Sequence, residues 1–585
     1  MAPTIVPLEQ LVNEWLRLDP NPITRDEIRR LWDHQQIDEL EQRMRTRIEF
    51  GTAGLRGKME AGWARMNDLI VIQASQGLCA YVLRSIPEAS IRGVVVGHDH
   101  RHNSGRWASL TAQVFISNNI KVYFHRGFVH TPLVPFSVKK LNAACGVMIT
   151  ASHNPKDDNG YKVYWENAVQ SILQNLEPRI EHMPDVYTSP LCIDCSDSMK
   201  QSYFTLIRGL VMTKVAHSSA KFVNTSMHGV SDPFISEAFR QVGFAPCIPV
   251  EKQRLPDPNF QTVKFPNPEE KGALDLAISE ATASGADYVL AQDPDADRFT
   301  AAERGADGLW FLFTGDQLGA LFADHVLGKY KATGKPLSKL AMIASIVSSK
   351  MVEAMARVEG FKFVDCLTGF KFIGNTALDL VAAGYEVPFG YEEAIGFMFG
   401  SEIRDKDGVA ATVMFAELVA EVRRRGLTVH EYLEELYQRY GYFETKNSYF
   451  ICSDPVTIDR IFWGIRHSQE SDSTIHYPSS IAGLAVNSVI DLTAGYGYDS
   501  TNAPSYQPRL PLSSGHMVQF RAQSTDDLNI KIVLTIRTSG TEPKIKYYLE
   551  GSATDRQELA RILNLIVKDL AEVWMKASEH GLRSP

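Results

Sequence analysis

Residues 93–126 read GVVVGHDHRHNSGRWASLTAQVFISNNIKVYFHR, and this stretch decides the fold class. The apolar run over residues 93–99 has the length and the valine content of a buried parallel strand. Residues 105–119 place their apolar side chains at helical spacing, and residues 121–126 form a second short apolar run. A strand, a helix and a second strand in succession predict a β-α-β unit, and therefore an α/β domain.

The same alternation continues along the chain. Residues 132–143 predict a helix and residues 145–150 a strand; the pattern begins again at residue 220, reaches a strand over 286–292, and begins a third time at residue 340. After residue 443 the pattern changes, because residues 531–551 predict strand, loop and strand, and residues 555–577 predict a long helix. We therefore expect three similar α/β domains, over 1–207, 208–318 and 319–442, and a C-terminal α+β domain over 443–585.

Composition limits the class of protein. Apolar residues make up 44% of the 585 residues and charged residues 22%, as in ordinary soluble globular proteins. The formal net charge of -9 argues against a general nucleic-acid binder. We find no signal peptide, and no apolar run near the ~20 residues of a membrane span. The odd number of cysteines, seven, fits a reducing compartment, so we expect a cytoplasmic protein; its oligomeric state is not predicted.

Cys192 and Cys195 form a C-x-x-C pair. A zinc or redox site would need a second such pair or a thioredoxin-like context, and neither is near in the sequence. We expect two ordinary loop cysteines.

The first motif that could carry out chemistry is ITASHNPKDDNGYKVYW, residues 149–165. Ser152 follows the predicted strand over 145–150, and active-site groups of α/β folds gather at the carboxyl ends of strands. Asn154 and Pro155 predict a turn that directs the serine hydroxyl outward. His153 and Lys162 offer the base or cation that a hydroxyl nucleophile needs. The alternative is a solvated Asn-Pro turn.

The second motif is DPDADR, residues 293–298, directly after the predicted strand over 286–292. Asp293, Asp295 and Asp297 project toward one side of an extended loop and repel one another unless a cation lies among them. Oxygen ligands favour Mg²⁺ or Ca²⁺. An EF-hand loop needs Gly and Glu where this chain has Arg298 and Arg304, so that interpretation fails. Three carboxylates leave room for a phosphate oxygen as a further ligand of the ion, which favours Mg²⁺. The alternative is a solvated acidic loop.

Two further segments predict anion binding. FGTAGLRGKME, residues 50–60, places three glycines at a spacing of three, which brings backbone close to an anion, although it matches neither a Walker A loop nor G-x-G-x-x-G. RTSGTEPKIKYY, residues 537–548, offers Arg537, Ser539 and Thr541 on a glycine-containing turn, which suits a phosphate group. The first could also be a simple glycine-rich turn.

A fifth motif consists of two loops. TGFKFIGN, residues 368–375, carries Lys371. GYEEAIGFMFGSEIRDKDG, residues 390–408, offers Glu392 and Glu393 as acceptors for sugar hydroxyls, followed by Arg404 and Lys406. Either loop could instead lie on the surface.

Together, and in this order from Phe50 to the C-terminal domain, the five motifs resemble the α-D-phosphohexomutase superfamily of phosphoglucomutases, phosphomannomutases and phosphopentomutases. The resemblance implies four domains around a central cleft, a sugar bisphosphate activator and sugar phosphates as substrates. It also implies that Ser152 is a phosphoserine that joins Asp293, Asp295 and Asp297 as a ligand of Mg²⁺. His153, Lys162 and Arg56 should surround the transferring phosphoryl group. The implied substrate-binding residues are Thr368, Gly369, Lys371, Glu392, Glu393, Arg404, Lys406, Arg298, Arg537, Ser539, Gly540 and Thr541.

One position departs from the hexose-specific pattern. Many hexose-specific members read Glu-Glu-Ser or Glu-Met-Ser in the sugar loop, where this chain has Ala394. The motifs look most like the eukaryotic phosphoglucomutase-2/phosphopentomutase branch, which also contains a glucose-1,6-bisphosphate synthase. We expect a mutase for ribose or deoxyribose phosphate with glucose phosphate as a secondary substrate. The alternatives are a bisphosphate synthase with an acyl phosphate donor, or a non-catalytic binding relative.

Overall fold

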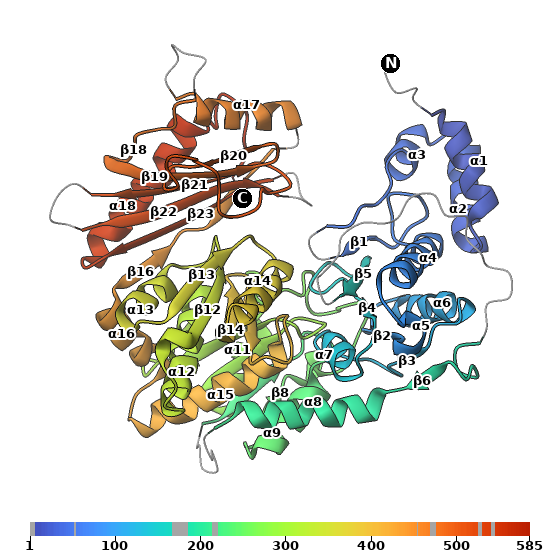
Figure 1. The fold of residues 1–585 in the computed structure, drawn as a ribbon, viewed down its shortest axis with the longest axis horizontal. Helices are drawn as coiled ribbons and strands as arrows, with labels where there is room; N and C mark the ends of the chain where they lie inside the picture. The colour runs from blue at the N-terminus through green and yellow to red at the C-terminus, as the bar shows by residue number, and fades with distance from the viewer. Residues whose placement is uncertain are drawn as a thin grey trace. The chain divides into compact units, whose positions relative to one another are not determined.

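The computed structural model describes residues 6–51, 54–165, 185–212, 220–452, 454–468, 475–524, 529–539 and 544–584 (Figure 1). The chain divides into two compact units. The first unit contains residues 1–334 and 369–430, and the second contains residues 335–368 and 431–585. The third predicted domain, 319–442, contributes residues to both units, and the domain boundaries stay a prediction.

The first unit begins with helices α1 (Leu8–Leu18), α2 (Pro22–Asp33) and α3 (Ile37–Met44), followed by a six-stranded sheet of order β1-β5-β4-β2-β3-β6. Strands β2, β3, β4 and β6 are parallel; β5 pairs antiparallel with β4, and β1 pairs antiparallel with β5. The strands are β1 (Leu55–Lys58), β2 (Val94–His98), β3 (Val122–Phe124), β4 (Cys145–Ile149), β5 (Asp158–Tyr164) and β6 (Cys192–Asp194). The β-α-β unit predicted over residues 93–126 is confirmed as β2, α6 (Ser104–Ser117) and β3.

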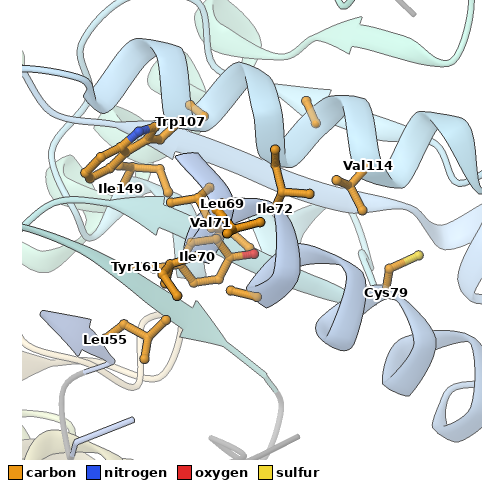
Figure 2. Packing of buried hydrophobic residues seen from close by; sticks show 14 of the residues in the cluster. Leu55, Leu69, Ile70, Val71, Ile72, Cys79, Trp107, Val114, Ile149 and Tyr161 are labelled. Carbon is orange, nitrogen blue, oxygen red and sulfur yellow. The ribbon is translucent and has the colours of Figure 1, made fainter. Parts of the chain in front are cut away.

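The core of this sheet is formed with two helices, α4 (Asp68–Ser85) and α6 (Figure 2). Trp107 of α6 is 1% exposed and donates from its indole nitrogen to Asp68 Oδ1 at 2.8 Å. Tyr161 of β5 is fully buried in the same core. A large apolar side chain buried in this way contributes about 1.5–3 kcal/mol. Because side chains alternate along a strand, anchoring Tyr161 in the core turns its neighbour Lys162 to the opposite face.

A second sheet in the first unit has the order β11-β10-β9-β7-β8. Its strands are β7 (Phe222–Thr225), β8 (Ile248–Pro249), β9 (Tyr288–Gln292), β10 (Phe299–Arg304) and β11 (Trp310–Leu312), with helices α9 (Asp232–Val242), α10 (Glu251–Arg254) and α11 (Asp275–Ser284). Strands β7, β8 and β9 are parallel. Strand β9 is buried along its whole length and ends directly before Asp293, as the sequence predicts.

The remainder of the first unit is mostly helical. Its elements are α5 (Ala89–Arg92), α7 (Leu133–Lys140), α8 (Ser196–Leu210), α12 (Gly315–Ala332), α14 (Phe370–Ala382), β14 (Glu386–Glu392), β15 (Gly396–Phe399) and α15 (Gly408–Arg424). Strands β14 and β15 form an antiparallel hairpin in which Glu392 pairs with Gly396. The hairpin loop therefore consists of Glu393, Ala394 and Ile395.

The second unit contains the parallel pair β12 (Leu340–Ser345) and β13 (Lys362–Cys366), connected through α13 (Met351–Glu359). It also contains an antiparallel sheet of order β16-β23-β22-β21-β19-β18, in which β17 pairs with β23 and β20 with β19. The elements are α16 (Val429–Tyr440), β16 (Tyr442–Thr445), β17 (Ser448–Ile451), α17 (Pro455–Arg466), β18 (Ser480–Ile481), β19 (Leu484–Thr493), β20 (Tyr496–Asp499), β21 (Met517–Gln523), β22 (Lys531–Thr538), β23 (Lys544–Ala553) and α18 (Arg556–Asp569). The two strands and the helix predicted for the C-terminal domain are confirmed as β22, β23 and α18, and residues 540–543 lie outside the described residues.

No helix in the described ranges is both long and apolar enough to cross a membrane. All seven cysteines are free thiols. Cys192 begins strand β6 and Cys195 directly precedes α8, so the pair does not lie in a simple loop as the sequence analysis expected.

Candidate active site

Ser152 lies at the carboxyl end of β4 with a left-handed backbone, φ 54°. The Ser152 hydroxyl donates to Asp293 Oδ2 at 2.7 Å. Nδ1 of His153 lies 3.2 Å from Ser152 Oγ. The sequence predicts an outward-facing hydroxyl. Instead, Ser152 is only 1% exposed, because the hydroxyl turns toward the carboxylates after β9. A serine and an aspartate from two different sheets thus meet at one point.

Asp293, Asp295 and Asp297 form a buried group in which one carboxylate oxygen of each residue lies within 4.8 Å of the others. Lys162 donates to Asp295 Oδ2 at 2.7 Å and to Asp297 Oδ2 at 2.9 Å, and Lys406 Nζ lies 3.3 Å from Asp297 Oδ2. Oδ1 of Asp295 and Oδ1 of Asp297 accept no hydrogen bond from the described part of the chain, although both are buried. Unsatisfied buried carboxylate oxygens at this spacing fit a hard divalent cation with oxygen ligands.

The acidic residues of this group differ in their pKa. Burial, with Asp295 and Asp297 close by, raises the pKa of Asp293 well above its usual value. Burial alone would also raise the pKa of Asp295, but Lys162 and the Thr131 hydroxyl outweigh burial and lower it. Burial, with Arg298 and Arg56 nearby, holds the pKa of His153 well below its ordinary value, so its imidazole is neutral. The triad therefore combines mutual repulsion with fixed cations at its edge.

The backbone of the metal loop, residues 293–298, is held at three carbonyl oxygens. Val230 N donates to Pro294 O at 2.9 Å, Thr131 N to Asp295 O at 2.9 Å, and Gly408 N to Ala296 O at 3.1 Å. Glycine is required at position 408, since a Cβ there would lie 2.3 Å from the carbonyl oxygen of Arg298. Three separate segments therefore fix the positions of the triad.

The metal loop is also joined to the sugar loop, which we define as Glu392–Gly396. Arg298 donates from a terminal nitrogen to Ala394 O at 3.1 Å, and Phe299 N donates to Ile395 O at 3.0 Å. Ile395 has φ 52°, a conformation that a β-branched residue rarely adopts and that is typical of functional loops. Glu392 is 9% exposed; burial raises its pKa, and Lys406 and Arg298 partly offset this effect.

Arg56 reaches this region from β1. Strand β1 pairs with β5 so that Arg56 faces Gly160, where a Cβ would lie 2.6 Å from the carbonyl oxygens of both Leu55 and Thr150. Arg56 donates to Asn154 Oδ1 at 3.4 Å, and burial lowers its pKa. Gly160 thus permits the close approach of the Arg56 segment to the segment that carries Ser152.

The other predicted site residues lie as follows. Arg404 donates to Val387 O at 2.8 Å and to Gly400 O at 3.2 Å, so its guanidinium braces the β14–β15 hairpin. Lys371 Nζ lies 4.9 Å from the ring centre of Phe372, and burial lowers the pKa of Lys371. Glu393 and Gly369 are half-buried in the first unit, as is Thr368 at the edge of the second unit.

The predicted phosphate turn belongs to the second unit. Arg537 donates to Thr538 O at 3.4 Å and to the Tyr548 hydroxyl at 3.2 Å, and Ser539 N donates to Lys544 O at 2.9 Å. Gly540 and Thr541 lie outside the described residues.

Two residues with clear contacts to the site were missed by the sequence analysis. The Thr131 hydroxyl donates to Asp295 Oδ2 at 2.5 Å. Arg101 donates to Ser152 O at 2.7 Å. Arg101 follows β2, a parallel neighbour of β4. Because active-site groups gather at the carboxyl ends of parallel strands, the position of Arg101 also predicts a role at the site. Thr131 follows β3 at a greater distance and carries no comparable signal.

Comparisons with known proteins identify the family of the chain. Family models for the phosphoglucomutase/phosphomannomutase α/β/α domains I, II and III match residues 47–185, 201–306 and 314–440. A probable phosphoribomutase of Schizosaccharomyces pombe is 42% identical, with 99% of each chain covered. Human glucose 1,6-bisphosphate synthase is 40% identical over 98% of this chain and 95% of its own, and human phosphopentomutase is 39% identical over 98% and 97%.

A solved structure supports the fold. The open form of parafusin, a phosphoglucomutase from Paramecium, superposes with a TM-score of 0.63 at 20% identity, covering 92% of this chain and 97% of its own. Full-length identity near 40% and three matched domains lead to one conclusion. The chain belongs to the phosphoglucomutase/phosphomannomutase family of the α-D-phosphohexomutase superfamily, in the branch of the phosphopentomutases and glucose 1,6-bisphosphate synthases.

Proposed function

We propose that the chain is a phosphomutase that interconverts the 1-phosphate and the 5-phosphate of ribose or deoxyribose, with glucose phosphate as a secondary substrate. The observation that carries the proposal is the buried Ser152 hydroxyl, 2.7 Å from Asp293 Oδ2 at the edge of the acidic triad. The similarity to proteins named phosphoribomutase and phosphopentomutase, over nearly the whole chain, supports the pentose substrate.

The proposed reaction uses Ser152 as a phosphoryl carrier. The bond between Ser152 Oγ and phosphorus breaks while the sugar hydroxyl oxygen bonds to phosphorus, which gives a sugar bisphosphate. One proton moves from the sugar hydroxyl to the released serine oxygen. The His153 ring nitrogen, 3.2 Å from Oγ, supports a role for His153 in carrying that proton. After the bisphosphate turns over, its other phosphoryl group returns to Ser152 by the reverse step.

Charge neutralisation supplies most of the catalysis in phosphoryl transfer. Mg²⁺ held by Asp293, Asp295 and Asp297 would neutralise charge on the transferring group. Lys162 contacts Oδ2 of Asp295 and of Asp297, and Lys406 contacts Oδ2 of Asp297, which leaves Oδ1 of Asp295 and of Asp297 for the ion. Arg56 and Arg298 add positive charge, and Glu392 offers a carboxylate to sugar hydroxyls. Arg537 and Ser539 offer hydrogen-bond donors to a phosphate group.

The test is a steady-state comparison of ribose 1-phosphate and glucose 1-phosphate, each with its own bisphosphate activator. Higher kcat/KM for ribose 1-phosphate, lost in Ser152→Ala, is the expected result. The second candidate function is a glucose 1,6-bisphosphate synthase, favoured by the 40% identity to the human enzyme of that name. Formation of bisphosphate from glucose 1-phosphate and an acyl phosphate, without mutase turnover, would establish the synthase. Absence of both reactions would indicate a non-catalytic binding protein.

A further inference from the structure

Arg101 lies between β2 and α6 and contacts the backbone of the serine loop, which we define as residues 152–158. The side chain of Arg101 is fully buried. One terminal nitrogen donates to Pro155 O at 2.8 Å and to Asp158 O at 3.0 Å. The other donates to Ser152 O at 2.7 Å and to Asn154 O at 2.6 Å. Four carbonyl oxygens of one short loop thus accept hydrogen bonds from a single guanidinium.

The remaining contacts of Arg101 fix the guanidinium itself. Its Nε lies 3.5 Å from Asp99 Oδ2, and Asp99 Oδ1 accepts from Arg101 N at 2.9 Å and from the Ser104 hydroxyl at 2.6 Å. The guanidinium carbon lies 5.0 Å from the ring centre of Phe260, which is 3% exposed. A carboxylate and an aromatic ring therefore help to fix the plane of the guanidinium that contacts the loop.

The hydrogen-bond count separates Arg101 from a substrate-binding arginine. A guanidinium has four N–H groups on its two terminal nitrogens, and Arg101 directs two from each nitrogen to backbone carbonyls. None of the four is left for a phosphate group. Arg101 therefore acts on the loop backbone and not on the substrate.

The loop needs such a support because Ser152 adopts φ 54°. Left-handed backbone at a residue other than glycine is strained and persists only where surrounding contacts over-determine it. In this conformation the Ser152 hydroxyl reaches Asp293 Oδ2. A lysine presents its three donors from one point, so it lacks the planar fork that spans these carbonyl oxygens.

We propose that Arg101 is a positioning residue that holds the serine loop in the conformation in which the Ser152 hydroxyl faces the acidic triad. Its catalytic consequence rests on the proposed role of Ser152 as phosphoryl carrier, whereas its effect on the loop does not. Without the fork, the loop samples conformations in which the hydroxyl points away from Asp293. Phosphoryl transfer then slows, while groups that bind the sugar stay in place.

The experiment uses full-length Arg101→Ala and Arg101→Lys, with Arg126→Lys as the matched control. The Arg126 side chain is 47% exposed and pairs with Asp194 at 3.4 Å, an exposed pair that contributes little. Amide hydrogen exchange of peptides covering residues 150–160 is measured in the dephosphorylated proteins. We expect faster exchange in this segment for both Arg101 variants, with unchanged exchange in β7 and β9.

Kinetics and chemical rescue complete the test. A misplaced nucleophile predicts a fall in kcat of about 100-fold with little change in KM. Guanidinium ion at non-denaturing concentration should restore part of kcat to Arg101→Ala, and methylammonium should not, because only guanidinium reproduces the fork.

Unchanged loop exchange, exchange that rises equally across the whole domain, or an effect confined to KM would each overturn the proposal. If Arg101→Ala does not fold, Arg101→Lys decides by the same exchange and kinetic criteria. An inactive wild type would refute the proposed function, and the exchange result would still decide whether Arg101 holds the loop.

Discussion

The hydroxyl of Ser152 donates a 2.7 Å hydrogen bond to Asp293 Oδ2, although 141 positions separate the two residues in the chain. Ser152 lies in the loop that follows a strand of the first sheet, and Asp293 directly follows a strand of the second. The contact brings the proposed phosphoryl carrier to the proposed metal site.

Ser152→Ala should abolish mutase turnover, because the variant lacks the hydroxyl oxygen that would carry the phosphoryl group. Intact-mass measurement of the wild type should show one phosphate adduct that maps to the peptide containing Ser152, and the variant should lack it. Ser109→Ala is the matched control, since the Ser109 hydroxyl donates to Gly105 O within helix α6. An alanine variant with full turnover would exclude Ser152 as the carrier.

Mg²⁺ should stabilise the protein as well as support activity. Binding to the native state alone adds about 2.7 kcal/mol at 100 times Kd. Thermal unfolding should therefore shift upward with Mg²⁺ in the wild type and much less in Asp295→Asn, which loses one anionic ligand of the triad. Asp307→Asn, at an exposed turn, should behave as the wild type. Activity that survives complete chelation would contradict the metal site.

Ala394→Ser should narrow the preference for ribose 1-phosphate over glucose 1-phosphate. Ala394 lies in the three-residue loop between β14 and β15, and its carbonyl oxygen is held by Arg298, so a serine there keeps the loop backbone and adds a hydroxyl. One hydrogen bond contributes about 0.5–1.5 kcal/mol, which corresponds to a shift of a few-fold to about tenfold in the ratio of kcat/KM values. Ala394→Cys, similar in size but a weak donor, is the control. Higher wild-type efficiency on glucose 1-phosphate would reject the pentose substrate.

Glu417→Gln should destabilise the protein at neutral pH and much less in acid. Burial raises the pKa of Glu417, but His325 at 2.9 Å and Lys329 at 2.6 Å outweigh it and lower the pKa to about 2. Relative to the ordinary 4.5, this shift corresponds to about 3 kcal/mol. Because the folded pKa is depressed, the stabilisation is complete above pH 4.5 and is lost as the pH falls toward 2.

The measurement is the melting temperature of the wild type and of Glu417→Gln between pH 7 and pH 3. The difference should be largest at neutral pH and should shrink below about 4.5. Glu280→Gln, an exposed residue of α11, is the control and should change little at any pH. A difference that does not depend on pH would show that the charge of Glu417 is not the source of the stabilisation.

Much of the local structure follows from sequence pattern. The valine run before Asp99 predicts β2, and the apolar run before Ser152 predicts β4, because buried parallel strands need apolar side chains on both faces. The position of Asp293 directly after β9 is predicted in the same way. The sequence analysis erred where local turn chemistry was the only guide: the Asn-Pro turn predicts an exposed hydroxyl, and the Ser152 hydroxyl is buried.

The sequence by itself determined the α/β class, the residues at the ends of the strands and the resemblance to phosphohexomutases, because periodicity and short motifs depend on neighbours along the chain. Tertiary structure alone decided that Ser152 faces Asp293, that Arg298 holds the carbonyl of Ala394, and that Arg101 uses its four terminal N–H groups on the serine loop. These contacts join segments far apart in sequence. Their geometry depends on how the cores beneath the loops pack, which no local pattern encodes.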